Sequence, residues 1–194
     1  MNSIIDVIGA LIASTVIIIT ILLTIINIQK IKYNSETLLG LYSAGDLIAS
    51  AIDQEYLEKV GYNLYNDEVR ITVATPTNFH FNYKSTRTAT SMNNVRIFTS
   101  VVNGNTSLQA IDPIVPPGGF DSTPVFLESG NIFTYYDGGN PPAPTTVLDD
   151  IHSVKVELVF IAPAWNDNPT KPNLRYPITF WRYFKNVYID NPRP

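Results

Sequence analysis

The chain has 194 residues and carries 13 Lys and Arg against 17 Asp and Glu, for a net charge of −4. This balance lacks the clustered basic surface that neutralises phosphates, so no nucleic-acid partner is expected. The absence of Cys and the presence of only two His residues exclude disulfides, thiol catalysis, zinc fingers and multi-histidine metal sites. Neither a cofactor nor a metal is expected.

The N-terminal stretch is apolar over the thickness of a bilayer. Residues 7–26 contain no charge and no proline, and a helix of that length rises about 30 Å, which matches a hydrocarbon core. A cleaved secretory signal has a shorter core behind a basic front end, whereas the first basic residues here are Lys30 and Lys32. We therefore expect a helix that enters a membrane or a helical bundle, and we expect that a short basic leader was removed during maturation.

The helical pattern continues past the apolar stretch as one stripe of apolar side chains at spacings of three and four. A single helix is predicted over residues 3–60, with Gly61 as its C-terminal cap and with Gly40 and Gly45 as points where it could bend. Residues 1–61 form the first predicted domain, of which residues 1–30 are the membrane-spanning or filament-core part. The stripe consists of Leu38, Leu41, Tyr42, Ile48, Ile52, Tyr56 and Val60.

Asp6 is the only charged residue before Lys30, and it has two interpretations. It can belong to a helix start in which Ser3 is the N-cap and the carboxylate interacts with the positive end of the helix dipole. Alternatively, it can pair with the N-terminal amine of a neighbouring chain, because a charge in an apolar helix cluster is tolerated only when it is paired.

Residues 3–13, SIIDVIGALIA, resemble the N-terminal segment of type IV pilins and pseudopilins. Residues 147–156, VLDDIHSVKV, show a weaker similarity to a late strand of pseudopilin-like heads. The resemblance implies a processed N-terminus and an acidic fifth residue that aids assembly, and Asp6 is fifth if Asn2 comes first and sixth from Met1. A helical bundle also favours small residues that allow close helix approach. The predicted assembly residues are Met1, Asn2, Asp6, Gly9, Ala10, Ala13 and Ser14.

The chain departs from the family pattern in three ways. Its acid is aspartate rather than the usual glutamate, the apolar span lacks the proline of many major pilins, and no disulfide can close a C-terminal loop. These differences favour either a divergent major subunit or a minor, pseudopilin-like subunit.

Residues 62–194 form a predicted β-rich head, in which apolar and polar residues alternate as in half-buried antiparallel strands. The fold class is therefore α+β, with the long N-terminal helix packed on a C-terminal antiparallel sheet. Proline- and glycine-rich loops are predicted at residues 112–119, 137–144 and 163–177. The predicted strands lie near residues 69–73, 79–83, 95–99, 131–136, 153–161 and 178–189.

No motif predicts an enzyme. His80 and His152 are the only histidines that could act as a base or ligand, and turn or surface positions explain both. Asp137 with Asn140, and Asp167 between Asn166 and Asn168, lack the ligand spacing of a calcium loop.

Two further features have a structural and a functional interpretation. Asn105 begins a glycosylation sequon, which matters only if the head is external. A group of aromatic residues could form a carbohydrate or partner surface or belong to strand packing. The group consists of Tyr135, Tyr136, Trp165, Trp181, Tyr183 and Phe184.

The sequence thus predicts a structural subunit of an extracellular type IV pilus-like filament, inserted in a membrane before assembly and located at the cell surface afterwards. Its expected partners are copies of itself and, by the resemblance, a leader peptidase and inner-membrane assembly machinery. Two alternatives remain open: a minor pilin or pseudopilin of a secretion or uptake machine, and a single-pass anchored surface domain that binds a ligand.

Overall fold

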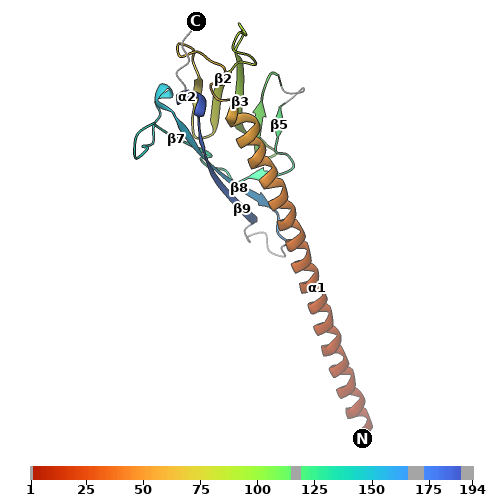
Figure 1. Ribbon diagram of the computed structural model, residues 1–194. Coiled ribbons are helices and arrows are strands. Elements are labelled where there is room, and N and C mark those ends of the chain that lie inside the picture. The colour runs from red at the N-terminus through yellow and green to blue at the C-terminus, as the bar shows by residue number, and fades with distance from the viewer. Residues whose placement is uncertain (1, 115–118, 166–172, 189–194) are drawn as a thin grey trace.

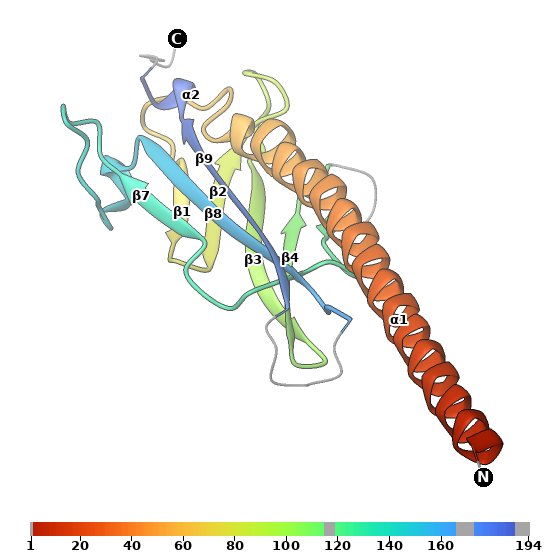
Figure 2. The same cartoon turned by 90° about the horizontal axis from the view of Figure 1, so that it is seen from below.

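A computed structural model describes residues 2–114, 119–165 and 173–188. Its longest element is helix α1 (Asn2–Ser50), whose N-terminal half projects away from a β-rich head as a free rod (Figure 1). The second half of α1 lies along one side of the head in both views (Figure 2). The predicted α+β fold class is confirmed.

The helix ends in two irregular turns inside the head. A π-helical turn, η1 (Ala51–Tyr56), and a 3-10 turn, η2 (Leu57–Lys59), extend α1 without a break. Gly61 follows with a φ of +68°, a left-handed conformation that glycine adopts at low cost. The predicted helix and its glycine cap are therefore confirmed.

Neither Gly40 nor Gly45 interrupts α1. Gly45 is instead a point of close approach, because a Cβ atom placed there would lie 2.9 Å from Cδ2 of Phe160 and 3.0 Å from Cδ1 of Tyr176. A Cβ atom on Gly40 would have nothing within 4 Å. The prediction of a bend is wrong at both positions, and at Gly45 the glycine lets the helix backbone rest directly on the sheet.

In the described part of the chain, nine antiparallel strands form one sheet in the order β1-β2-β3-β4-β6-β8-β7, with β5 beside β4 and β9 beside β8. Five of the six predicted strands lie close to their predicted positions, as β1, β2, β3, β7 and β8. The strands are β1 (Ile71–Ala74), β2 (Asn78–Tyr83), β3 (Asn93–Val102), β4 (Asn105–Ile111), β5 (Phe120–Asp121), β6 (Phe126–Leu127), β7 (Phe133–Tyr136), β8 (Ser153–Ala162) and β9 (Leu174–Tyr183).

The last predicted strand is wrong in its limits. Strand β9 starts within the predicted loop 163–177 and ends at Tyr183, after which a short helix, α2 (Lys185–Tyr188), follows. Pro177 lies inside β9 opposite Val159 of β8. A proline is tolerated there because β8 is the only strand that pairs with β9 among the described residues.

The core lies between the amphipathic part of the helix and the inward faces of the strands. Most of the predicted stripe is buried, whereas Leu38 is half-buried and Tyr42 stays 38% exposed. At the centre, the ring of Phe79 lies within about 6 Å of Phe81, Tyr135 and Phe184. Aromatic packing of this kind adds to the stability that burial of apolar surface provides.

Gly45→Ala should destabilise the protein by about 1–2 kcal/mol, because the new methyl group overpacks a buried interface. Gly40→Ala is the matched control, and it should stabilise the helix by about 0.5–1 kcal/mol through helix propensity alone. Urea unfolding of the full chain in detergent, followed by circular dichroism, measures both changes. Equal effects of the two variants would contradict the close approach at Gly45.

Candidate assembly surface

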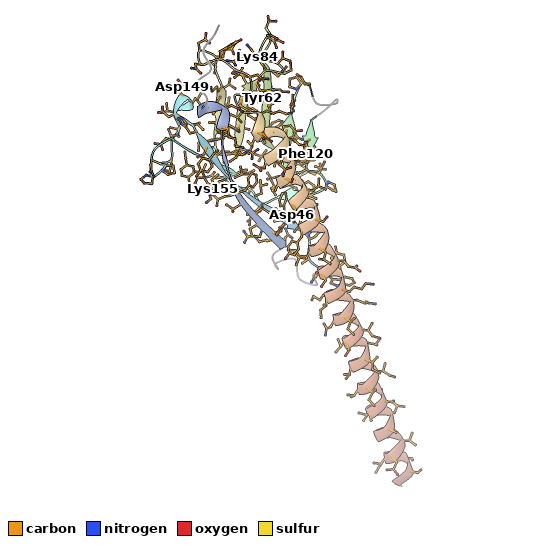
Figure 3. The ribbon with its side chains drawn as sticks, in the orientation of Figure 1. Asp46, Tyr62, Lys84, Phe120, Asp149 and Lys155 are labelled. Atoms are coloured by element: carbon orange, nitrogen blue, oxygen red, sulfur yellow. The ribbon has the colours of Figure 1, made fainter. Side chains whose placement is uncertain are left out.

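The free half of α1 exposes every large aliphatic side chain that it carries. Each Ile, Leu and Val among residues 4–31 is between 44% and 66% exposed. Figure 3 shows these side chains pointing outward on all sides, with no part of the head beside them. The helix over Ser3–Lys59 is, by length and composition, able to cross a membrane, and none of its most apolar stretch is buried. An exposed apolar surface of this kind is typical of a helix that contacts lipid or other helices.

Five of the predicted assembly residues share one face of this free half. Positions 6, 9, 10, 13 and 14 follow the spacing of three and four that places side chains on one side of a helix. All five are exposed, and a Cβ atom on Gly9 would meet nothing within 4 Å. The surface is therefore free to approach another helix closely. It consists of Asp6, Gly9, Ala10, Ala13 and Ser14.

The hydroxyl groups of this half are hydrogen-bonded within the helix. Ser14 and Thr15 both donate to the carbonyl of Leu11, at 3.0 and 2.8 Å. Thr20 and Thr24 each donate at 2.8 Å to the carbonyl four residues earlier. Because these donors are satisfied locally, the hydroxyls add little cost when the helix enters an apolar environment.

The predicted helix start is wrong in detail. Helix α1 already contains Ser3, so Ser3 is not the N-cap, and Asp6 lies beyond the first turn. Met1 lies outside the described residues, and the side chain of Asn2 is not described.

The head holds the second half of the helix through polar contacts as well as apolar packing. Tyr176 on β9 donates a hydrogen bond to Asp46 at 2.7 Å. Arg182, also on β9, lies 3.5 Å from carboxylate oxygens of both Asp53 and Glu58. Strand β9 is thus linked to α1, to η1 and to η2.

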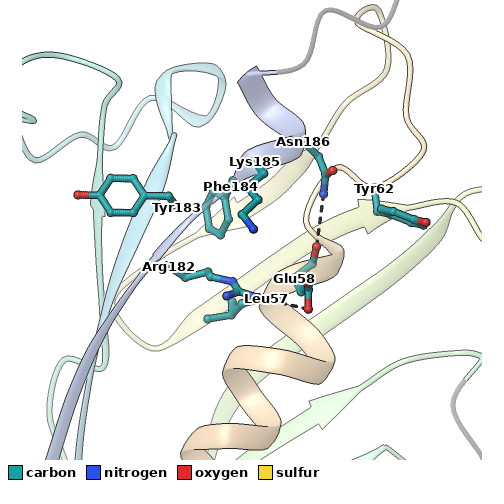
Figure 4. A pocket seen from close by; sticks show the side chains of 8 residues that line it. All are labelled: Leu57, Glu58, Tyr62, Arg182, Tyr183, Phe184, Lys185 and Asn186. Atoms are coloured by element: carbon teal, nitrogen blue, oxygen red, sulfur yellow. Dashed lines mark hydrogen bonds and ion pairs between the residues drawn. The ribbon is translucent and has the colours of Figure 1, made fainter.

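The end of the helix is capped by a side chain from the C-terminal part of the chain. Asn186 in α2 donates to the carbonyls of Glu58 and Val60, at 3.3 and 3.1 Å. These residues border a small pocket of about 100 Å³, in which Arg182 and Asn186 both point toward Glu58 (Figure 4). The bonds satisfy carbonyls that a helix end leaves unpaired.

A buried carboxylate fixes the end of the helix to the sheet. Asp112, which is 3% exposed, accepts hydrogen bonds from Lys59 at 2.8 Å, from the hydroxyl of Tyr83 at 2.8 Å and from the amide of Ile114 at 3.0 Å. Burial pushes the pKa of Asp112 upward, but these hydrogen bonds and the charge of Lys59 hold it below its usual value. Burial and the hydrogen bond to Asp112 raise the pKa of Tyr83.

The sequence analysis missed this cluster and a second buried pair. Lys84 lies 2.7 Å from Glu68, and both side chains are almost fully buried. No sequence pattern connects residues so far apart in the chain. Both clusters stabilise the fold. The Asp112 cluster joins the end of the helix to the head, and the ion pair of Lys84 and Glu68 joins two segments of the head.

The two histidines occupy separate structural positions. His80 lies on β2 between the fully buried Phe79 and Phe81, as predicted, and burial together with the charge of Arg96 lowers its pKa. His152 precedes β8, and its Nδ1 lies 2.8 Å from the carbonyl oxygen of Asp150. Among the described residues, neither histidine belongs to a group of three or more possible metal ligands.

The candidate calcium ligands form a turn. One carboxylate oxygen of Asp137 accepts hydrogen bonds from the amides of Gly139 and Ala143, at 3.1 and 2.8 Å, and these bonds lower the pKa of Asp137. Asn140 follows in the same exposed loop. Among the described residues, no group of three or more acidic or histidine side chains could hold a metal ion. The second candidate group, residues 166–168, lies outside the described residues.

Asn105 is exposed at the first position of β4, directly after a tight turn. Its hydroxyl partner in the sequon, Ser107, is fully buried and lies 2.8 Å from Ser100. Glycosylation at Asn105 stays a prediction.

The aromatic group that could form a binding surface does not gather in one place. Tyr135 and Phe184 belong to the core. Trp181 contacts Tyr136 on the outer face of the sheet, with ring centroids 4.5 Å apart. Trp165 instead lies beside α1.

A scan against protein-family models found no match, and a search of curated proteins found no relative. Among solved structures, the chain is similar to a type IV-like pilin from Thermus thermophilus, with 12% sequence identity and a TM-score of 0.46. That alignment covers 76% of this chain and 98% of the other.

Asp112→Asn should destabilise the protein by about 2 kcal/mol at neutral pH, because it leaves the charge of Lys59 without its buried partner. It should also flatten the acid dependence of stability. A carboxylate with a lowered pKa in the folded state contributes stability above its unfolded pKa, and this contribution is lost as the pH falls through the folded pKa.

Urea unfolding of both proteins between about pH 7 and pH 3 tests this expectation. Asp149→Asn, at an exposed position in the 3-10 turn η3 (Leu148–Asp150), is the control and should unfold like the wild type. A wild type and an Asp112→Asn variant with parallel acid dependence would contradict the role of Asp112.

Proposed function

We propose that the chain is a structural subunit of an extracellular type IV pilus-like filament, assembled through the free half of α1. The observation that carries this proposal is the exposure of every large aliphatic side chain among residues 4–31 on a helix whose other half is fixed in a folded head. At about 1 kcal/mol for each such side chain, leaving this surface in water costs on the order of 15 kcal/mol. The helix therefore needs either lipid or other helices around it.

In this proposal, lipid and a helical bundle are successive environments of the same surface. Before assembly, the helix spans a membrane, and the head lies outside the lipid. On assembly, helices from many copies form the filament core, and the heads form its outer layer at the cell surface. A leader peptidase and inner-membrane assembly machinery would act on the chain before and during this step.

Asp6 has a specific place in the assembly step. A carboxylate inside an apolar bundle is costly unless it is paired, and the N-terminal amine of a neighbouring chain is a suitable partner. The exposed small residues Gly9, Ala10, Ala13 and Ser14 share the face of Asp6 and allow two helices to approach closely enough for the pair to form.

Electron microscopy of material sheared from the surface of producing cells tests the proposal, together with mass spectrometry of the chain's N-terminus. Filaments built mainly of this chain would support a major subunit, and the measured N-terminus would show whether Asp6 is the fifth residue. A trace amount of the chain in filaments built of another protein would indicate a minor pilin or pseudopilin. A chain that stays monomeric in the membrane would overturn the proposal in favour of an anchored binding domain.

Asp6→Ala should reduce the yield of filaments about tenfold or more, because an incoming subunit loses the charge pair that guides docking. Asp6→Glu keeps the charge and should restore a large part of the yield, whereas Asp149→Ala, on the head, should leave it unchanged. Counts of sheared filaments by electron microscopy give the yield, and circular dichroism of the purified chains confirms that each head is folded. Wild-type yield from Asp6→Ala would refute the role of Asp6.

A further inference from the structure

Two aromatic rings meet where the free half of α1 reaches the head. Trp165, which follows β8, contacts Tyr33 of α1 edge-on, with ring centroids 5.6 Å apart. The backbone amide of Trp165 also donates a hydrogen bond to the side chain of Asn34 at 2.7 Å. Each ring remains 38% exposed. The head therefore supplies a tryptophan at a defined level of the helix, from a position 131 residues further along the chain than Asn34.

That level coincides with the edge of a bilayer around the free half of α1. The uncharged stretch runs from Val7 to Gln29, and at 1.5 Å per residue it is about 34 Å long. With a modest tilt, this length spans a hydrocarbon core of about 30 Å. Asp6 and Lys30 then lie at its two edges. Tyr33 lies about one helical turn beyond Lys30, in the layer of lipid headgroups.

The chemistry of these residues suits that layer. Tryptophan and tyrosine rings accumulate at membrane interfaces because one part of the ring is apolar and another part is polar. Lys30 and Lys32 precede Tyr33 on the helix. The aliphatic stems of lysines at such positions run along lipid, while their ammonium groups reach the headgroups. The apolar surface also continues without a gap into this region, since Ile28 and Ile31 are 60% and 66% exposed.

We propose that Tyr33 and Trp165 form an interfacial anchor that seats the head on the phospholipid headgroups while α1 is inserted in the membrane. The inference rests on the membrane-inserted stage of the proposed function and adds a second contact with lipid, made by the head itself. The anchor sets the depth of the helix and the side of the head that faces the bilayer. It must leave the headgroup layer when the subunit leaves the membrane.

The chain provides its own control, because it contains two tryptophans. Trp181 lies opposite Lys155, while Leu174 at the other end of β9 lies opposite Ala162, three residues before Trp165. Trp181 and Leu174 are therefore about 23 Å apart along β9, and Trp165 lies beyond the Leu174 end. Trp181 is also exposed, at 42%, so it is accessible to any lipid that reaches it.

The full chain is reconstituted into vesicles of phosphatidylcholine and phosphatidylglycerol, with and without lipids brominated close to the headgroup. Trp181→Phe leaves Trp165 as the only tryptophan, and Trp165→Phe leaves Trp181, with emission excited selectively from tryptophan. A third variant combines both replacements with Ile17→Trp, which places a fluorophore in the middle of the span. Lipids brominated deep in the chains quench this third reporter if α1 is inserted, and circular dichroism verifies that each variant is folded.

Lipids brominated close to the headgroup should lower the tryptophan emission of Trp181→Phe by about half and leave that of Trp165→Phe nearly unchanged. If the Ile17→Trp reporter is quenched but neither native tryptophan is, the helix spans the membrane and the anchor is refuted. Equal quenching of both native tryptophans also refutes it, because the head would then contact lipid without a preferred side. If the Ile17→Trp reporter is not quenched, the membrane stage of the proposed function fails, and the anchor fails with it.

Discussion

The fixation of the second half of α1 in the head is the contact on which the rest of the molecule depends. Apolar packing begins at Leu41 and continues through the π-helical and 3-10 turns. Because Gly45 has no side chain, the helix backbone can contact Phe160 and Tyr176 of the sheet directly. The ion pairs of Arg182 and the buried bond between Lys59 and Asp112 then prevent the helix from sliding or rotating on the sheet. Without this fixation, the head could not hold the free half in a constant direction.

The two halves of α1 place opposite demands on the surroundings of the protein. The stability of a typical domain is about 5–15 kcal/mol, which is similar to the cost of leaving the free half in water. The free half is also exposed to water in the unfolded chain, so this cost does not reduce the stability of the head. It is instead a free-energy difference of similar size that favours moving the helix from water into lipid or a bundle of helices.

Periodic patterns predicted most of the architecture. The spacing of apolar residues gave the helix as far as Gly61, and alternation gave the core strands, because burial on one face leaves a repeating signal. Strand β4 was missed although the sequence contains its signal, the pair Asn103-Gly104, which is typical of a tight hairpin turn. In the structure both residues adopt positive φ, at 51° and 81°. The two-residue strands β5 and β6 are too short for any period to be recognised.

The contacts that fix the helix could not be predicted in the same way. Lys59, Tyr83 and Asp112 are brought together only by the completed sheet, and no sequence pattern links a lysine at the helix end, a tyrosine on a strand and an aspartate in a loop. The start of β9 was missed because Pro177 indicates a loop, and only the pairing of β9 with a single neighbour makes the proline acceptable. The common face of Asp6 and the small residues could be derived from the sequence because it depends on the spacing within one helix, and its role in assembly stays a prediction.

In the proposed transfer of the helix from lipid to a filament, the hydrogen bonds of Ser14, Thr15, Thr20 and Thr24 to carbonyls of their own helix would stay intact. None of these polar groups needs a partner from outside, so none has to be released when the surroundings change. The barrier to transfer then comes from the exchange of van der Waals contacts and from the charge at Asp6, rather than from broken hydrogen bonds. These side chains keep their hydrogen bonds in any surroundings in which the helix itself stays intact.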